Sequence, residues 1–147
     1  MIRVAMLSYW HVHAWDYTRQ AKEHADTEIV AVWDELPDRG RAAAEKLGVP
    51  FYDDLHTLLA RSDVDAVICD APTNIHREVL VAAAQAGKHI FTEKVVAATL
   101  ADVNAVLASI CSDPRHRFLP EDLNALDSPW AAIRGNRQIT DAYLLAL

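Results

Sequence analysis

A series of short apolar segments, separated by stretches with the length and capping signals of helices, constrains the fold most. Such segments are typical of strands buried on both faces. Strands that alternate with helices at this spacing favour right-handed βαβ units and a parallel sheet. We predict strands at 2–7, 28–33, 49–52, 66–69, 89–92 and 117–120. The expected helices lie at about 12–23, 37–47 and 55–60, from the turn at 72–74 to 86, at 99–112 and at 141–147.

This order predicts a single α/β domain over residues 1–147, built as a three-layer Rossmann-like, doubly wound parallel sheet with strand order 3-2-1-4-5-6. Two sets of residues give helix boundaries. Pro37 suits the first turn of a helix and Gly48 its C-terminal end. Thr99 with Asp102 resembles a capping box. In such a sheet the first strand is central, and the turn after it faces the ligand crevice.

The turn at 8–13 lacks the glycines of the phosphate-binding pattern G-x-G-x-x-G. Its backbone N–H groups could still hold a pyrophosphate at a helix N-terminus. Alternatively, it is a packed turn in which Tyr9 and Trp10 cover the end of the sheet. We favour the packed turn, because bulky side chains obstruct the close approach that glycine allows. The candidate cofactor-binding residues in this turn are Ser8, Tyr9, Trp10 and His11.

Two histidines in the same turn, His11 and His13, raise the question of a metal site, with His76 or Asp70 as a further ligand. An H-x-H pair on a turn need not converge on one ion, so we expect no metal there.

The composition argues against several classes of function. A net charge of −7 argues against nucleic acid as a partner. The sequence contains no run of eighteen apolar residues, so we expect no membrane span, and we also expect no secretory leader. The two cysteines, Cys69 and Cys111, are expected to be buried free thiols, which fits a cytoplasmic protein.

With these elements assigned, residues 1–107 resemble the N-terminal dinucleotide-binding domain of the glucose-fructose oxidoreductase and inositol dehydrogenase family (Gfo/Idh/MocA). The resemblance rests on the first strand, on AVWD at 31–34 and on DVDAVICDAPTNIHREVLVAAAQAGKHIFTEK at 63–94. It implies that Asp34 receives the ribose hydroxyls, which favours NAD because a carboxylate repels a 2′-phosphate. It also implies cofactor contacts from Pro72, Thr73, Asn74, His76, Glu93 and Lys94. Lys94 is the single catalytic candidate, and Val95 stands where the family motif has proline.

The last part of the chain, 108–147, resembles the C-terminal part of PIN-domain ribonucleases of the VapC toxin type. The segments HRFLPEDLNALDSP and RGNRQITDAYLLAL carry this resemblance. Asp141 matches the acidic residue that opens a late helix in those enzymes and would be their metal ligand. By itself, Asp141 is better explained as a helix-start carboxylate that the macrodipole favours. We place the join of the two parts at about 101–107.

Together these resemblances predict an engineered chimeric α/β scaffold with no catalytic turnover, no required cofactor and at most weak NAD binding. A second hypothesis is an NAD(P)-dependent oxidoreductase that acts on a sugar or polyol. A third is a metal-dependent ribonuclease, which would need a cluster of acidic residues. We expect homodimerisation through the surface that a missing second domain would cover. Apolar residues expected to cover part of that surface are Trp130, Ile133, Tyr143, Leu144 and Leu145.

Overall fold

The structure of the protein is a computed structural model that describes residues 1–116. Several predictions concern residues outside this part of the chain. They are the strand at 117–120, the helix at 141–147 with Asp141, and the five apolar residues expected to cover exposed surface.

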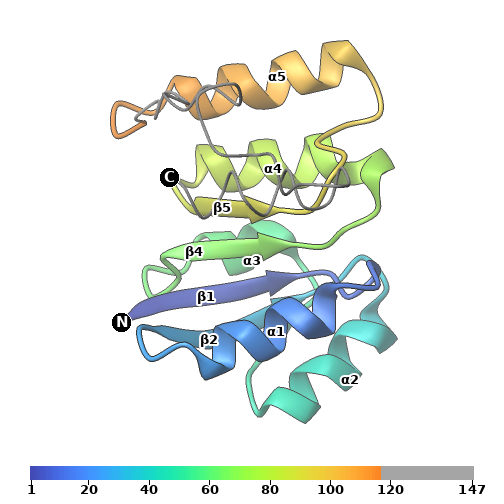
Figure 1. The fold of residues 1–147 in the computed structure, drawn as a ribbon, viewed down its shortest axis with the longest axis vertical. Helices are drawn as coiled ribbons and strands as arrows, with labels where there is room; N and C mark the ends of the chain where they lie inside the picture. Colours follow the sequence, from blue (N-terminus) through green and yellow to red (C-terminus); the bar gives the residue numbers. More distant parts are fainter. Residues whose placement is uncertain (117–147) are drawn as a thin grey trace, which may run out of the picture. The chain divides into compact units, whose positions relative to one another are not determined.

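The described residues form one parallel sheet with the order β3-β2-β1-β4-β5, which confirms the predicted order for these strands (Figure 1). The strands are β1 (Ile2–Leu7), β2 (Thr27–Trp33), β3 (Phe51–Tyr52), β4 (Ala66–Cys69) and β5 (His89–Thr92). β1 is central, and β2 and β4 pair with it on either side.

Helices cover both faces of the sheet, so the three-layer α/β fold is confirmed. They are α1 (Ala14–Glu23), α2 (Pro37–Leu47), α3 (Leu55–Leu59), α4 (His76–Gln85) and α5 (Leu100–Cys111), with the short 3-10 helix η1 (Thr73–Ile75). In Figure 1, α1 and α2 lie in front of the sheet and α3 behind it, while α5 lies next to α4.

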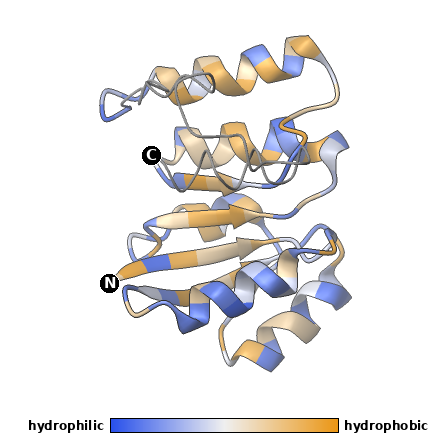
Figure 2. Cartoon of the chain, in the orientation of Figure 1, coloured by the Kyte–Doolittle hydropathy of each residue, from blue (hydrophilic) through white to orange (hydrophobic). Residues whose placement is uncertain are grey.

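Successive residues of β1 serve the two faces in turn, as the two-residue period of a strand requires. Ala5 and Leu7 belong to the core that packs against α3 and α4. Met6 belongs to the core that packs against α1 and α2. Because both faces are buried, the strand is apolar throughout its C-terminal half, and Figure 2 shows the same apolar character along β4.

Most of the predicted helix boundaries are confirmed. Pro37 begins α2, and Gly48 ends it with a φ of 72°. The Thr99 side chain caps α5 by accepting the N–H of Asp102 at 3.1 Å. The sequence also predicts that the turn Pro72-Thr73-Asn74 caps the next helix; the turn is present, but no side chain there caps α4, so the predicted cap is wrong.

The burial of the two cysteines and the expected lack of a membrane span can both be checked in residues 1–116. Cys69 is a buried free thiol as expected, whereas Cys111 is exposed, because it occupies the last turn of α5, away from the sheet. Within residues 1–116, no helix has both the length and the apolar character needed to cross a membrane.

Candidate functional site

The candidate site lies at the carboxyl end of the sheet, at the position where the strand order reverses. β1 pairs with β2 on one side and with the later strand β4 on the other. In open α/β sheets, ligands bind outside the carboxyl ends of the strands at such a position. The turn at 8–13, Asp34, Asp70 and Glu93 follow β1, β2, β4 and β5, respectively, so all four lie at this edge.

The turn at 8–13 begins with Ser8 in a left-handed conformation, with a φ of 76°. This region of φ favours glycine, because a Cβ atom is crowded there. Ser8 is fully buried, and its hydroxyl accepts a hydrogen bond from the N–H of Trp10. Ser8 therefore gives the turn the backbone path that a glycine would give, with an added hydroxyl acceptor.

Three consecutive backbone N–H groups of this turn point into the protein. They belong to Tyr9, Trp10 and His11, and each donates one hydrogen bond. Their acceptors, in the same order, are Asp34 Oδ2 at 2.8 Å, Ser8 Oγ at 3.1 Å and the Asp70 carbonyl oxygen at 3.1 Å. These donors are engaged within the chain, so the geometry corresponds to the packed turn and not to an open phosphate cradle.

The two aromatic side chains of the turn differ in burial. The Tyr9 ring is buried, and its hydroxyl pairs with Thr18 Oγ1 at 3.0 Å. Trp10 is 51% exposed. Tyr9 thus packs over the end of the sheet as predicted, while the indole of Trp10 extends from the surface beside the crevice.

Asp34 directly follows β2, at the position that the family resemblance implies. Its carboxylate is buried, and all its acceptor positions are hydrogen-bonded. Its carboxylate accepts the N–H groups of Tyr9 and Leu36, each at 2.8 Å. Arg39 donates to both oxygens, at 2.9 Å from Nε and 2.7 Å from Nη2. These four bonds fill the acceptor positions of a carboxylate. The Asp34 hydrogen bond in turn raises the pKa of Arg39.

Gly40 allows this arrangement by its lack of a side chain. A Cβ atom at this position would lie 2.6 Å from the Cβ of Asp34 and would also clash with the ring of Phe51. Because real Cβ contacts are never this short, only glycine lets α2 approach the end of β2 this closely.

The segment after β4 places its predicted cofactor residues in two different environments. Pro72 and Thr73 are partly buried and Asn74 is exposed at the start of the 3-10 helix. His76 is 1% exposed, and its Nε2 lies 2.7 Å from the Ala71 carbonyl oxygen. Its Nδ1 lies 2.9 Å from the Val95 carbonyl oxygen, so His76 joins the loops after β4 and β5.

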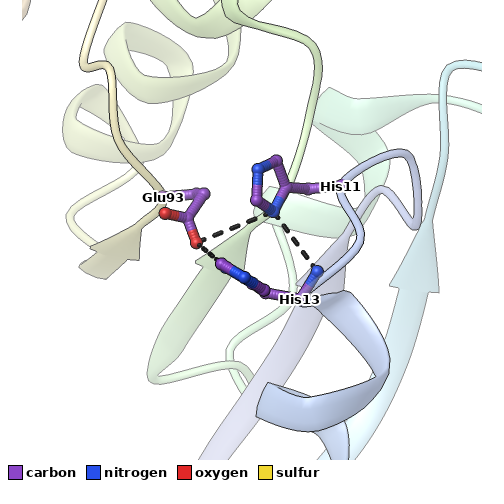
Figure 3. A group of neighbouring side chains, drawn as sticks. All are labelled: His11, His13 and Glu93. Carbon is purple, nitrogen blue, oxygen red and sulfur yellow. Dashed lines mark hydrogen bonds and ion pairs between the residues drawn. The ribbon is translucent and has the colours of Figure 1, made fainter.

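Glu93 lies beside His11 and His13 (Figure 3), and Tyr17 completes this polar cluster. Its Oε2 lies 2.8 Å from His13 Nδ1 and 3.7 Å from His11 Nδ1, and it accepts the Tyr17 hydroxyl at 2.6 Å. Burial alone would raise the pKa of Glu93, but hydrogen bonds from Tyr17 and His13 lower it to about 2. The same bond raises the pKa of Tyr17 to about 12.

Lys94 follows Glu93 but points to solvent. Its side chain is 74% exposed, and its Nζ lies 3.5 Å from Glu93 Oε1. The ammonium group is therefore solvent-exposed and within ion-pair distance of Glu93.

Asp70 is the unusual group of the site. It is fully buried, and neither carboxylate oxygen has a hydrogen-bond partner among the described residues. Burial, together with the negative charge of Glu93, raises the pKa of Asp70 to about 7, and the charge of His13 opposes this rise. A buried carboxylate without a hydrogen-bond donor is costly, so such groups occur preferentially at functional sites.

Three functional contacts were missed by sequence reasoning. Arg39 donates a hydrogen bond to Asp34, Tyr17 donates one to Glu93, and the His13 ring is hydrogen-bonded to Glu93. The spacing of Arg39, five residues after Asp34 and within the first turn of the next helix, is a signal that could have identified the first. The other two depend on how the turn after β1 crosses the end of β4, which no local pattern encodes.

Comparison with known proteins identifies the chain's relatives. The model of the oxidoreductase family with an NAD-binding Rossmann fold (GFO_IDH_MocA) matches residues 5–115. Myo-inositol 2-dehydrogenase of Thermotoga maritima is 42% identical over 83 residues, which is 56% of this chain and 25% of the relative. The chain thus spans about a quarter of the length of this curated relative.

Solved structures agree with this result. An NAD-binding protein from Listeria innocua is 30% identical, with a TM-score of 0.66 over 74% of this chain and 32% of the other. A 3-ketoreductase from Actinomadura kijaniata, solved with NADP and TDP-benzene, is 28% identical, with a TM-score of 0.66 over 75% of this chain and 34% of the other.

These findings correct three expectations. The prediction of an engineered scaffold without turnover is wrong, because the matched relatives are inositol dehydrogenases and NAD-binding oxidoreductases. The expectation that no cofactor is required has no support in a family described as NAD-binding. The resemblance to the oxidoreductase family was expected to end at about residue 107, whereas the family match continues to residue 115. The comparisons give the PIN-domain resemblance of 108–147 no support, and most of that segment lies outside the described residues.

Proposed function

Because the chain belongs to the oxidoreductase family with an NAD-binding Rossmann fold, we propose that it serves an NAD(P)-dependent oxidation or reduction of a sugar or polyol. The observation that carries this proposal is the family match over residues 5–115, which includes every strand end that forms the crevice. The relatives named above include an inositol dehydrogenase and a ketoreductase solved with NADP, and this favours a hydroxyl or keto substrate.

In this proposal, the described residues form the cofactor half of the enzyme. The dinucleotide lies along the carboxyl ends of the strands, with its adenosine ribose near Asp34 and its pyrophosphate beside the turn at 8–11. Pro72, Thr73 and Asn74 line the route towards the nicotinamide. When bound, the nicotinamide exchanges a hydride with the substrate carbon. The matching region covers only a quarter to a third of the length of these relatives. We therefore propose that most contacts to the substrate are made by residues outside that region.

Lys94 and His76 take different roles in this proposal. Lys94 is exposed and next to Glu93, so it is the residue that we propose contacts cofactor and substrate. His76 is enclosed, with both ring nitrogens directed at carbonyl oxygens. We therefore propose that His76 positions the loops after β4 and β5 and does not touch the cofactor.

The Asp34–Arg39 pair determines the choice of cofactor in this proposal. Ribose hydroxyls can bind Asp34 only if Arg39 gives up at least one of its bonds, since all acceptor positions are filled. If Arg39 stays in place, its guanidinium is suited to the 2′-phosphate of NADP. We propose NAD as the cofactor, because the buried carboxylate repels a 2′-phosphate.

Isothermal titration with NAD and NADP tests this proposal. For the wild-type protein we expect NAD to bind with a dissociation constant of about 0.1 mM, equivalent to about −5.5 kcal/mol. The affinity is modest because three N–H groups of the turn at 8–13 already donate hydrogen bonds within the chain. We expect Arg39→Ala to retain or strengthen NAD binding, since it frees two acceptor positions on Asp34.

Arg41→Ala is the matched control, because Arg41 lies on the same helix but pairs with the exposed Asp53. It should leave the affinity for NAD unchanged. Failure of both cofactors to bind at millimolar concentration would contradict the proposed function. Tighter binding of NADP than of NAD, lost in Arg39→Ala, would keep the oxidoreductase but reverse the choice of cofactor.

A further inference from the structure

We propose that His11, His13 and Glu93 form a binding site for a divalent transition-metal ion of the zinc class. Each residue offers one ligand atom, and the three atoms lie within 4.8 Å of one another. They come from two segments far apart in the sequence, the turn after β1 and the end of β5. Figure 3 shows both imidazole rings beside the same carboxylate oxygen.

The two distances from Glu93 to the histidines are close to those of a tetrahedral ion. Zinc binds nitrogen and carboxylate oxygen at about 2.0–2.2 Å, which places two tetrahedral ligands about 3.3–3.5 Å apart. Glu93 Oε2 lies 2.8 Å from His13 Nδ1 and 3.7 Å from His11 Nδ1. The two observed distances lie on either side of the ideal value. Small rotations of the partly buried His11 ring and the exposed His13 ring would admit the ion.

The surroundings of Glu93 hold its carboxylate in position. The Tyr17 hydroxyl donates to Oε2 at 2.6 Å, and the N–H of Lys94 donates to Oε1 at 3.1 Å. Hydrogen bonds of this kind fix ligating carboxylates in known metal sites and are nearly as important as the ligands themselves. Glu93 is only 6% exposed, so it is a rigid anchor.

Asp70 provides an independent observation that points to a cation. It is fully buried beside this cluster, with both oxygens unpartnered among the described residues. The backbone carbonyl of Asp70 accepts the N–H of His11, so the end of β4 and the turn at 8–13 are in direct contact. A divalent ion on His11, His13 and Glu93 would bring positive charge near a carboxylate whose oxygens have no hydrogen-bond partner within residues 1–116.

The ligand chemistry favours zinc over magnesium or calcium. Imidazole nitrogen suits zinc, copper, iron and nickel, whereas magnesium and calcium prefer oxygen ligands alone. Two histidines and one glutamate leave a fourth position open for water or a substrate oxygen. The site does not include Asp34 or Arg39, so it is separate from the ribose end of the crevice.

A zinc titration tests the site without any measurement of oxidoreductase activity. The full chain is treated with chelator, returned to metal-free buffer and titrated calorimetrically with Zn²⁺. Co²⁺ is then used as a spectroscopic probe, since tetrahedral Co²⁺ absorbs visible light much more strongly than octahedral Co²⁺. We expect one equivalent of Zn²⁺ to bind and a tetrahedral Co²⁺ spectrum to appear.

Three variants locate the ion. His13→Ala and Glu93→Gln should each weaken Zn²⁺ binding at least about tenfold. His56→Ala removes an exposed histidine on α3 and should leave binding unchanged. Circular dichroism of each variant checks that it is folded. His13 is 48% exposed, so its variant keeps the test valid if Glu93→Gln unfolds. Absence of Zn²⁺ binding in the wild type, or binding that His13→Ala does not weaken, would overturn the proposal.

Discussion

Ser8 is a serine that adopts the backbone conformation of a glycine. It occupies the start of the turn where the phosphate-binding glycines of a dinucleotide fold would begin. Its hydroxyl accepts the N–H of Trp10, which a glycine at this position could not do. The chain thus has a glycine-like backbone conformation at Ser8 and pairs the N–H of Trp10 internally.

Ser8→Gly and Ser8→Ala separate the cost of this conformation from the value of the hydroxyl. Both variants lose the Trp10 hydrogen bond, worth about 1 kcal/mol. Only alanine keeps the left-handed strain, about 1–2 kcal/mol, against roughly 0.5–1 kcal/mol that glycine loses through unfolded-chain entropy. From the midpoints of these ranges, we predict that the glycine variant is more stable than the alanine variant by about 0.75 kcal/mol in urea unfolding. Equal stability of the two variants would show that Ser8 is not strained.

Sequence reasoning placed the acidic residues of the site but not their partners. Asp34 and Glu93 follow apolar strands, and the ends of such strands can be identified from the sequence. That Asp34 is bonded by Arg39, and that Glu93 meets His13, depends on side-chain conformations and on the path of one turn. The H-x-H pair was expected not to converge, whereas the structure brings both rings to Glu93. Whether the predicted residues bind a cofactor stays a prediction.

At the scale of elements, the strands and helices were predictable where a local chemical signal exists. The apolar runs located β1, β2, β4 and β5, and the residues that end or cap helices located α2 and α5. β3 is only two residues long, shorter than the predicted 49–52, because its register with β2 covers only Val32 and Trp33. The start of α4 was less predictable, since a 3-10 turn precedes it and no side chain caps it.

The side-chain cap at the start of α5 leads to a prediction about the stability of the protein. Thr99 Oγ1 accepts the N–H of Asp102 at 3.1 Å and donates to its carboxylate at 2.7 Å. Thr99→Ala should lower the free energy of unfolding by about 1 kcal/mol, whereas Thr99→Ser keeps the hydroxyl and should cost far less. Thermal and urea unfolding of the pair provide the measurement. A serine variant as unstable as the alanine variant would mean that the threonine methyl group, and not the cap, supplies the stability.

At the scale of the molecule, the strand order followed from chain order and the handedness of βαβ crossovers. These rules leave few arrangements for alternating strands and helices, and the order of the five described strands confirms the prediction. The proposed sixth strand lies outside the described residues, and a single domain over 1–147 and a cytoplasmic location stay predictions. Among residues 1–116, β5 is the outermost strand on its side of the sheet.

Phe91 on β5 is a half-exposed aromatic residue at the edge of an apolar groove. Its side chain is 53% exposed and packs edge-on against Tyr17 of α1, with ring centroids 5.1 Å apart. The groove between α1 and the strands β1, β4 and β5 is lined mainly by apolar residues, among them Ile68 and Ile90. In a two-fold dimer the same patch serves both copies, so each interface would bury two such rings. We therefore propose a homodimer that forms through this groove.

Sedimentation at several protein concentrations tests the dimer, with Phe91→Ser as the disrupting variant. Full burial of a phenylalanine side chain contributes about 1.5–3 kcal/mol, and Phe91 has only about half of its area left to bury, so losing two such rings should weaken dimerisation at least about tenfold. Leu107→Ser is the matched control, because Leu107 is also half exposed but lies on α5 and does not line the groove. It should leave the association constant unchanged. A wild-type protein that stays monomeric at every concentration, or equal effects of the two variants, would contradict an interface at Phe91.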